Sequence, residues 1–187
     1  MPSKAKFSRE EVIAAAVDLV REKGIEALTA RGLGERLGSS ARPIFTVFDS
    51  MEQVKSEVIQ AAGMRYQQMV YEEMESQKYP PYKASGMAYI RFAREEKLLF
   101  QLLFMRDRTG EEENPNEIDP IVRLIRQNTG LDEETARLFH LETWAYVHGI
   151  AAMMATNYLE LDEELISRML TDHYQGLKYR HKGKENG

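Results

Sequence analysis

The chain has 187 residues, 43% of them hydrophobic and none of them cysteine, so it can bury its own core, and disulfides and cysteine-ligated zinc are excluded. The formal net charge is −5; residues 1–60 hold nine basic and nine acidic residues, so all of the excess acid lies in residues 61–187. The polar N-terminus lacks the apolar segment of a signal peptide, and no apolar run approaches the ~20 residues that span a bilayer. We therefore expect a cytoplasmic protein without a membrane partner.

Four helices are predicted in the first 75 residues, each opened by a capping residue and continued by apolar residues at helical spacing. A capping box formed by Ser8 and Glu11 opens the first, and Gly24 ends it. The predicted capping residues are Ser8, Thr29, Ser39 or Ser40, and Ser50 with Gln53. The second and third helices are short, and the fourth is long.

The rest of the chain also has helical periodicity, interrupted by prolines and by one acidic segment. The motif "KYPPYKASG" stops the fourth helix, and residues 84–105 are apolar with a break near "REEK". Residues 106–119 lack apolar periodicity and are predicted to be a loop. Further helices are expected over "PIVRLIRQN", after Asp132 and after Asp162. No strand alternation is found, so the predicted fold is all-α with about nine helices.

The stretch "LGSSARPIFTVFDS" is the most unusual in the chain. Two short helices, Thr29–Leu37 and Ala41–Phe48, are joined by "GSS", which is a turn of helix-turn-helix length. The second helix would expose small groups and Arg42, which can donate two parallel hydrogen bonds to guanine, while Ile44 and Phe48 face inward. This pattern favours a helix in the major groove of DNA, and a three-helix packing unit without a ligand remains the alternative.

Residues 9–58 resemble the DNA-binding domain of the TetR family of transcriptional regulators. The resemblance rests on the ungapped stretch "AAVDLVREKGIEALTARGLGERLGSSARPIFTVFDSMEQV". The residue types that agree with the family pattern are at Gly24, Leu28, Thr29, Leu33, Leu37, Gly38, Ser40, Ile44, Phe48 and Ser50. A fainter match, "WAYVHGI" at residues 144–150, is similar to one branch of the family's ligand-binding domains.

The resemblance implies binding to double-stranded DNA through the N-terminal helices. The implied contact residues are Thr29, Arg31, Ser39, Ser40, Ala41, Arg42, Phe45, Thr46 and Lys55. The first two would contact phosphate, and Arg42 with its neighbours would face the groove. The family usually has Tyr at Phe45, Lys at Met51 and an apolar residue at Ser39, so the phenolic phosphate contact is missing and Lys55 is expected to replace the Lys. Lys4 and Lys6 form either a basic arm or an ordinary solvated tail.

The last two helices are predicted to form a homodimer interface, because their apolar faces exceed what one contact requires. The alternative is that these faces are core. Gly149 with Ala151 and Ala152 makes a thin strip where a helix or ligand can approach closely. A two-fold dimer implies an inverted-repeat operator.

An apolar small-molecule effector is expected between residues 86 and 156, where many aromatic and methionine residues occur. The predicted ligand-binding residues are Phe92, Phe100, Phe104, His140, Thr143, Trp144, Val147 and His148. A solid core is the alternative. Two histidines eight residues apart make a poor metal site, so core histidines with hydrogen-bond partners are favoured, and no metal or cofactor is expected.

The sequence therefore predicts a helix-turn-helix domain over residues 1–52 and a helical effector-binding and dimerisation domain over residues 53–187. The predicted function is a transcriptional repressor that a small apolar effector releases from DNA. No catalytic motif is found, and no enzymatic activity is expected. The alternative function is a helical ligand-binding or protein-interaction module that has lost DNA binding.

Overall fold

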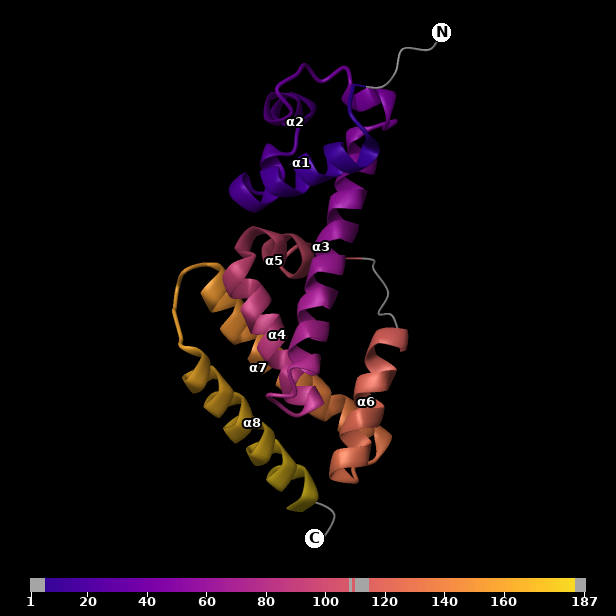
Figure 1. Cartoon of the computed structure of the whole chain (residues 1–187). Coiled ribbons are helices and arrows are strands. Elements are labelled where there is room, and N and C mark those ends of the chain that lie inside the picture. The colour runs from indigo at the N-terminus through magenta and orange to yellow at the C-terminus, as the bar shows by residue number, and fades with distance from the viewer. Residues whose placement is uncertain (1–5, 108, 110–114, 184–187) are drawn as a thin grey trace. The chain divides into compact units, whose positions relative to one another are not determined.

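The computed structural model describes residues 6–107, 109 and 115–183, and every regular element in these ranges is a helix (Figure 1). The elements in chain order are α1 (Arg9–Lys23), η1 (Ile25–Ala27), α2 (Ala30–Arg36), η2 (Ile44–Thr46), α3 (Met51–Glu75), α4 (Pro81–Glu95), α5 (Lys97–Phe104), α6 (Pro115–Thr129), α7 (Glu133–Ala155) and α8 (Glu163–Gly183). The two η elements are single 3₁₀ turns. The predicted all-α fold is confirmed.

Most helices begin where the predicted capping residue stands. The Ser8 hydroxyl accepts from the Glu11 amide at 3.1 Å and the Glu11 carboxylate accepts from the Ser8 amide at 2.7 Å, which completes the capping box of α1. The side chains of Thr29 and Asp132 cap α2 and α7 by accepting from the amides of Gly32 and Thr135. These bonds satisfy amides that have no partner within the helix.

The third predicted helix, residues 41–48, is the main difference in the first half of the chain. Only Ile44–Thr46 form a helical element, and it is a 3₁₀ turn with hydrogen bonds from Ile44 to the carbonyl of Ala41 and from Thr46 to that of Pro43. Proline has no amide proton, and the β-branched residues that follow it have low helix propensity. The structure therefore has eight α-helices in its described ranges, against about nine expected.

The described residues form two compact units, which are treated separately. Unit 1 is the chain up to Gln68 with Glu95–Arg106, and unit 2 is Met69–Arg94 with the chain from Asp107 onward. The long helix α3 contributes to both units. It is continuous across residue 52, where the sequence predicted the end of the helix-turn-helix domain. In unit 1, α1 packs against η1, α2 and α5.

The cores of both units are mainly aliphatic, with a few buried aromatic side chains in each. Buried residues of unit 1 include Val12, Ala16, Leu19, Val20, Leu33, Ile44, Phe48, Val54, Val58, Leu99 and Phe100. In unit 2, α6 packs against α7 and α7 against α8 (Figure 1). A cluster of Val122, Ile125, Leu131, Ala136, Phe139 and Leu177 fills the space among these three helices.

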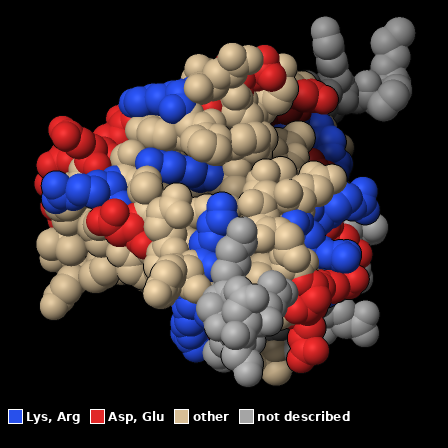
Figure 2. All heavy atoms as spheres, turned by 90° about the horizontal axis from the view of Figure 1, so that it is seen from below, with Lys and Arg blue, Asp and Glu red and all other residues tan. Residues whose placement is uncertain are grey.

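On the face of the molecule drawn in Figure 2, acidic and basic residues are interspersed among broad uncharged areas.

One buried carboxylate joins three helices of unit 1. Glu96, only 5% exposed, accepts two hydrogen bonds of 2.8 Å from the Arg21 guanidinium. The Arg65 guanidinium lies 3.6 Å from the same carboxylate. Glu96 directly precedes α5, Arg21 lies on α1 and Arg65 on α3, so the break between α4 and α5 coincides with this ion pair.

Candidate nucleic-acid interface and effector region

The turn between α2 and η2 is held tightly against α2. A Cβ atom at Gly34 would lie 3.0 Å from the amide nitrogen of Ala41 and 3.0 Å from the carbonyl carbon of Ser40. Both neighbours are backbone atoms that cannot rotate away, so a side chain at this position would have to push the turn outward and the close approach favours glycine. Gly34 therefore sets where the following residues lie. Its sequence signal is a glycine inside a short helix, where it costs stability relative to alanine.

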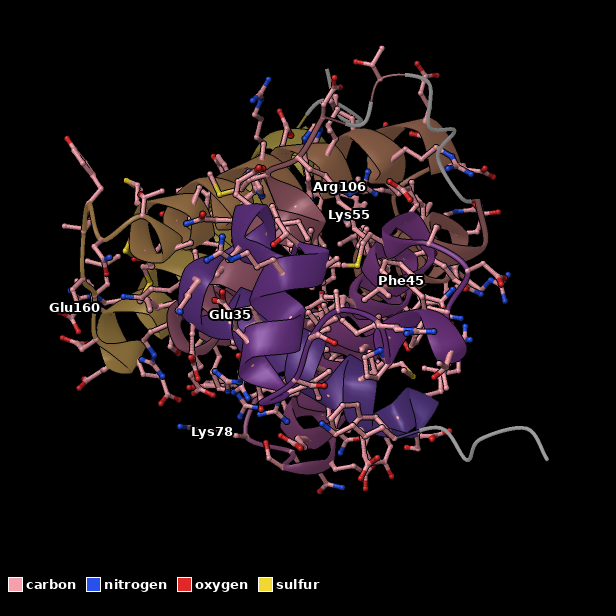
Figure 3. The ribbon with its side chains drawn as sticks, turned by 90° about the horizontal axis from the view of Figure 1, so that it is seen from above. Glu35, Phe45, Lys55, Lys78, Arg106 and Glu160 are labelled. Carbon is pink, nitrogen blue, oxygen red and sulfur yellow. The ribbon has the colours of Figure 1, made fainter. Side chains whose placement is uncertain are left out.

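The apolar side of η2 faces inward and its polar side faces solvent. Ile44 is 0% and Phe48 3% exposed, as predicted. Seven of the predicted DNA-contact residues are exposed, namely Thr29, Arg31, Ser40, Arg42, Phe45, Thr46 and Lys55, and Ser39 and Ala41 are half-buried. Figure 3 labels Phe45 on η2 and Lys55 on α3. The structure thus brings residues of α2, the turn, η2 and α3 to the surface of one compact unit.

The exposed basic residues of this surface differ in how they are already engaged. The Arg31 guanidinium donates to the Glu35 carboxylate at 2.8 Å, and this pair raises the pKa of Arg31. Among the described residues, Arg42 and Lys55 have no ion pair or hydrogen-bond partner for their side chains. A nucleic acid could therefore bind the Arg42 side chain directly, whereas it would have to displace Glu35 before it could bind Arg31.

Two hydroxyl groups of the turn also have intramolecular partners. The Thr46 hydroxyl donates to the carbonyl of Pro43 at 2.6 Å, and the Ser39 hydroxyl accepts from the Lys6 ammonium at 3.1 Å. Lys6 therefore lies beside the turn, while Lys4 lies outside the described residues. The Thr46 oxygen keeps its capacity to accept a hydrogen bond.

Arg9 fixes the end of η2, and sequence reasoning missed it. Its guanidinium donates to the Val47 carbonyl at 2.9 Å, forms an ion pair with Glu57 of α3, and stacks on the Phe48 ring at 4.2 Å from the ring centre. One side chain of α1 thus contacts both the segment after η2 and the helix that follows. The only sequence signal is a basic residue in the first turn of α1, where the helix dipole favours acids.

The predicted effector residues are divided between the two units. Phe100 and Phe104 belong to unit 1, where their ring centres lie 5.2 Å apart and Phe104 meets Tyr66 edge-on at 5.3 Å. The other predicted residues belong to unit 2. There Phe92 is 0% and Val147 6% exposed, so both are core residues.

Two tyrosine–histidine pairs join α4 to α7 in unit 2. The Tyr82 hydroxyl lies 3.2 Å from His140 Nδ1, and the Tyr89 hydroxyl lies 2.9 Å from His148 Nδ1. Burial lowers the pKa of both histidines and raises the pKa of Tyr82 to about 12. Uncharged rings are therefore favoured, and these histidines have the hydrogen-bond partners that the sequence favoured over metal ligation. Thr143 donates to the Phe139 carbonyl at 2.9 Å.

The outer face of α7 is apolar and exposed. Leu138, Leu141 and Trp144 keep 46%, 58% and 45% of their surface exposed, and the Trp144 ring stacks on His148 at 5.2 Å. A Cβ atom at Gly149 would meet nothing within 4 Å, so the strip beside it is open. On α8, by contrast, Ile166, Leu170 and Leu177 are buried within the chain. The surplus apolar surface that the sequence suggested therefore lies mainly on α7.

Within the ranges that the structure describes, no cluster of three His, Cys, Asp or Glu side chains suitable for a metal ion occurs. No helix in the same ranges has both the length and the apolar character needed to cross a bilayer.

Comparison with known proteins adds support from the opposite end of the chain. Residues 82–173 match the family described as "Tetracyclin repressor-like, C-terminal domain". Among solved structures, the chain is similar to SmeT, the repressor of the Stenotrophomonas maltophilia multidrug efflux pump SmeDEF, at 15% identity and a TM-score of 0.49, over 81% of this chain and 87% of SmeT. No curated protein sequence matches the chain significantly.

The C-terminal domain match and the helical architecture of the described residues define the class of the chain as transcriptional regulators. The protein is a TetR-like regulator. The family match lies outside residues 9–58, so it confirms the resemblance independently of the residues that first indicated it.

Proposed function

We propose that the protein is a homodimeric, cytoplasmic DNA-binding repressor that a small apolar molecule releases from an inverted-repeat operator. In functional terms, residues 1–52 would carry the DNA interface and residues 53–187 the dimer interface and effector site. The observation that carries the proposal is the exposed surface of the turn and η2. There the Arg42 side chain has no partner among the described residues, Phe45 is 46% exposed, and the buried side chains of Ile44 and Phe48 hold the segment to the core beneath.

The DNA interface is proposed to use Arg42 as a base reader and Arg31 with Thr29 and Lys55 as phosphate contacts. Arginine on guanine specifies sequence, whereas phosphate contacts position the protein and make binding salt-dependent. Phe45 lacks the phenolic hydroxyl of the usual tyrosine, and its exposed ring is suited to sugar or methyl contacts. Ser39, Ser40, Ala41 and Thr46 complete the surface.

The test is selection of binding sequences from random double-stranded DNA, followed by anisotropy titrations over a range of salt. The selected sequences should share an inverted repeat. Arg42→Ala should weaken specific binding by about 1–3 kcal/mol and relax one base pair per half-site. Arg31→Ala should weaken all sequences alike and reduce the salt slope. Arg168→Ala, an exposed arginine of α8, is the matched charge control.

Failure of the selection would favour the second function, a ligand-binding or protein-interaction module without DNA binding. The exposed Phe45 ring and the engagement of Arg31 by Glu35 are the observations in its favour. Equal losses for Arg42→Ala on specific and random DNA would remove the base-reading role and leave only charge attraction.

The dimer is proposed to form through the last two helices, with Leu138 and Leu141 of α7 at its centre. Large apolar residues at the centre of an interface usually carry most of its energy. Leu141→Glu should raise the dimer dissociation constant at least tenfold in sedimentation experiments, because it buries an unpaired charge. Leu159→Glu, in the segment between α7 and α8, is the control. A wild-type monomer at micromolar concentration would contradict both the dimer and the inverted repeat.

The effector is proposed to bind in unit 2 beside α4 and α7, near Phe92, Val147 and the two tyrosine–histidine pairs. A largely apolar molecule would pack on the aromatic residues, and His140, Thr143 or His148 would exchange its present partner for a polar group of the ligand. A coupling of about 1–3 kcal/mol between effector and DNA would weaken operator binding roughly 5–150-fold.

This proposal is tested by a thermal-shift screen of apolar and aromatic compounds, with operator titrations for each hit. Trp144 is the only tryptophan of the chain, so its fluorescence reports binding nearby. A hit whose affinity and effect on DNA are unchanged by Trp144→Ala would place the effector elsewhere.

A further inference from the structure

Unit 2 contains a cavity that the proposed effector region does not use. Its volume is about 260 Å³, and its walls come from the end of α3, the segment after it, α4 and the start of α8. The lining residues are Glu72, Glu73, Ser76, Lys78, Met87, Ile90, Arg91, Arg94, Glu163 and Ile166. No residue of α7 is among them, so this cavity is distinct from the tyrosine–histidine pairs.

The wall of this cavity is balanced in charge above an apolar base. It has three basic residues (Lys78, Arg91 and Arg94) and three acidic ones (Glu72, Glu73 and Glu163). The apolar lining residues Met87, Ile90 and Ile166 are 5%, 2% and 2% exposed. A ligand that is only positive or only negative would leave one charge of the cavity without a counterpart. A zwitterionic ligand, which carries a positive and a negative group, would keep the balance.

Among the lining residues, Arg91 has a donor nitrogen without a hydrogen-bond partner. Its terminal nitrogens donate to Glu73 at 3.2 Å and to Glu72 at 3.0 Å. Its Nε is buried and has no hydrogen-bond partner. Buried polar atoms without a partner are rare, and the guanidinium that carries this one belongs to a residue that lines the cavity. Arg94 of the same helix lines the same cavity and adds a second guanidinium.

Glu163 also lines the cavity, near Arg94, and it is held by exchangeable partners. The Lys78 ammonium lies 2.5 Å from its carboxylate, and the Tyr79 hydroxyl donates to it at 3.0 Å. The Lys78 and Glu163 side chains are 56% and 48% exposed, and exposed ion pairs of this kind are weak. A ligand ammonium group can therefore share or replace Lys78 at Glu163.

We propose that this cavity binds a zwitterionic amino acid with an apolar side chain. The carboxylate would be held by Arg91 and Arg94, the ammonium group by Glu163, and the side chain would lie on Met87, Ile90 and Ile166. This gives the chain a second small-molecule site, of different chemistry from the apolar effector region and independent of it.

The first test is calorimetric titration of the full chain with L-phenylalanine and two analogues that each lack one charge. 2-Phenylethylamine has no carboxylate, and 3-phenylpropanoate has no ammonium group. The amino acid should bind at least tenfold more tightly than either analogue, because each analogue loses a charge-assisted contact. No binding of L-phenylalanine, or equal binding of an analogue, would overturn the proposal.

The second test locates the site by matched substitutions. Glu163→Gln and Arg94→Gln should each weaken L-phenylalanine binding at least tenfold, while Glu160→Gln, an exposed residue labelled with Lys78 in Figure 3, should not. Thermal denaturation would establish that each variant is folded. Trp144→Phe should leave the affinity unchanged. Loss of binding in Trp144→Phe with none in Glu163→Gln would place the amino acid in the effector region and overturn the assignment.

Discussion

The two units of the molecule use different interactions to fix their functional residues. In unit 1 a short polar segment is placed by backbone contact and aliphatic packing, with Gly34 against the turn and Ile44 and Phe48 in the core. In unit 2 the corresponding residues are paired side chains, with Tyr82 and Tyr89 on α4 bound to His140 and His148 on α7. Unit 1 therefore presents the residues of the turn at its surface, while unit 2 pairs these tyrosines and histidines with one another between two helices.

This difference predicts which changes should lower the stability of each unit. Unit 1 contains no histidine, because all four histidines of the chain lie in α7 and α8. Its most buried charge is Glu96, which is paired with arginines. Unit 1 should therefore respond to the loss of one ion pair or one glycine, and unit 2 to pH.

The largest effect is expected for Glu96→Gln. Removing the carboxylate leaves Arg21 and Arg65 without their shared partner and should lower the free energy of unfolding by about 2 kcal/mol. The loss is below the ~3–5 kcal/mol typical of a fully buried pair, because the arginine side chains are 47% and 44% exposed. Urea denaturation measures it, with the exposed neighbour Glu95→Gln as control. Equal urea midpoints for the two variants would show that Glu96 does not hold the three helices together.

The next effect is a contrast between two glycines of unit 1. Gly34→Ala places a Cβ atom 3.0 Å from the backbone of the turn and should cost about 1–2 kcal/mol, whereas Gly63→Ala meets nothing within 4 Å. In helix α3 the second substitution should instead raise the free energy of unfolding by up to ~1 kcal/mol. Opposite shifts in thermal midpoint are the expected result. Gly34→Ala should also lose operator affinity, and Gly63→Ala should keep it.

A smaller effect is expected on the pH dependence of stability, which should differ between the two units. Burial lowers the pKa of His140, His148 and His173, so the unfolded chain takes up protons first as the pH falls below ~6.5. The stability that these uncharged histidines contribute is complete above that pH and is lost as the pH falls toward their lowered values. For His173, nearby Glu142 opposes the shift.

The measurement is the thermal midpoint followed through Trp144 fluorescence, which reports unit 2, at pH 7.5 and pH 5.5. The midpoint should be lower at pH 5.5, and His148→Gln should reduce the difference. Amide exchange corrected for intrinsic rates should show that α1 and α2 change less than α7. An equal loss of protection in both units would contradict the assignment to buried histidines.

The smallest effect on stability is expected for Glu35→Gln. The Arg31–Glu35 pair is exposed on both sides, at 90% and 66%, so the thermal midpoint should not change measurably. Binding to random DNA should nevertheless become tighter, because Arg31 is released and a negative charge is removed from the surface. Unchanged DNA binding would indicate that Arg31 lies outside the phosphate contacts.

The sequence alone was sufficient for the all-α fold and for most helix boundaries. Those boundaries depend on local signals, such as Ser8 with Glu11 and Thr29 three residues before Gly32, whose hydrogen bonds form within one turn. The inward positions of Ile44 and Phe48 followed in the same way from their spacing. The resemblance to the TetR family also rested on contiguous residues, and it was confirmed by the match over residues 82–173.

Only the tertiary structure decided which side chains meet across the chain. Arg9 with Val47, Glu96 with Arg21, and Tyr89 with His148 are separated by 38, 75 and 59 residues, and no local period relates such positions. It also reduced the expected third helix to a 3₁₀ turn, because proline lacks an amide proton and the β-branched residues that follow it have low helix propensity. The charged cavity of unit 2 combines residues from the end of α3 to the start of α8 for the same reason. Local hydrogen bonding fixes where helices begin and end, whereas burial among distant segments fixes what their side chains contact.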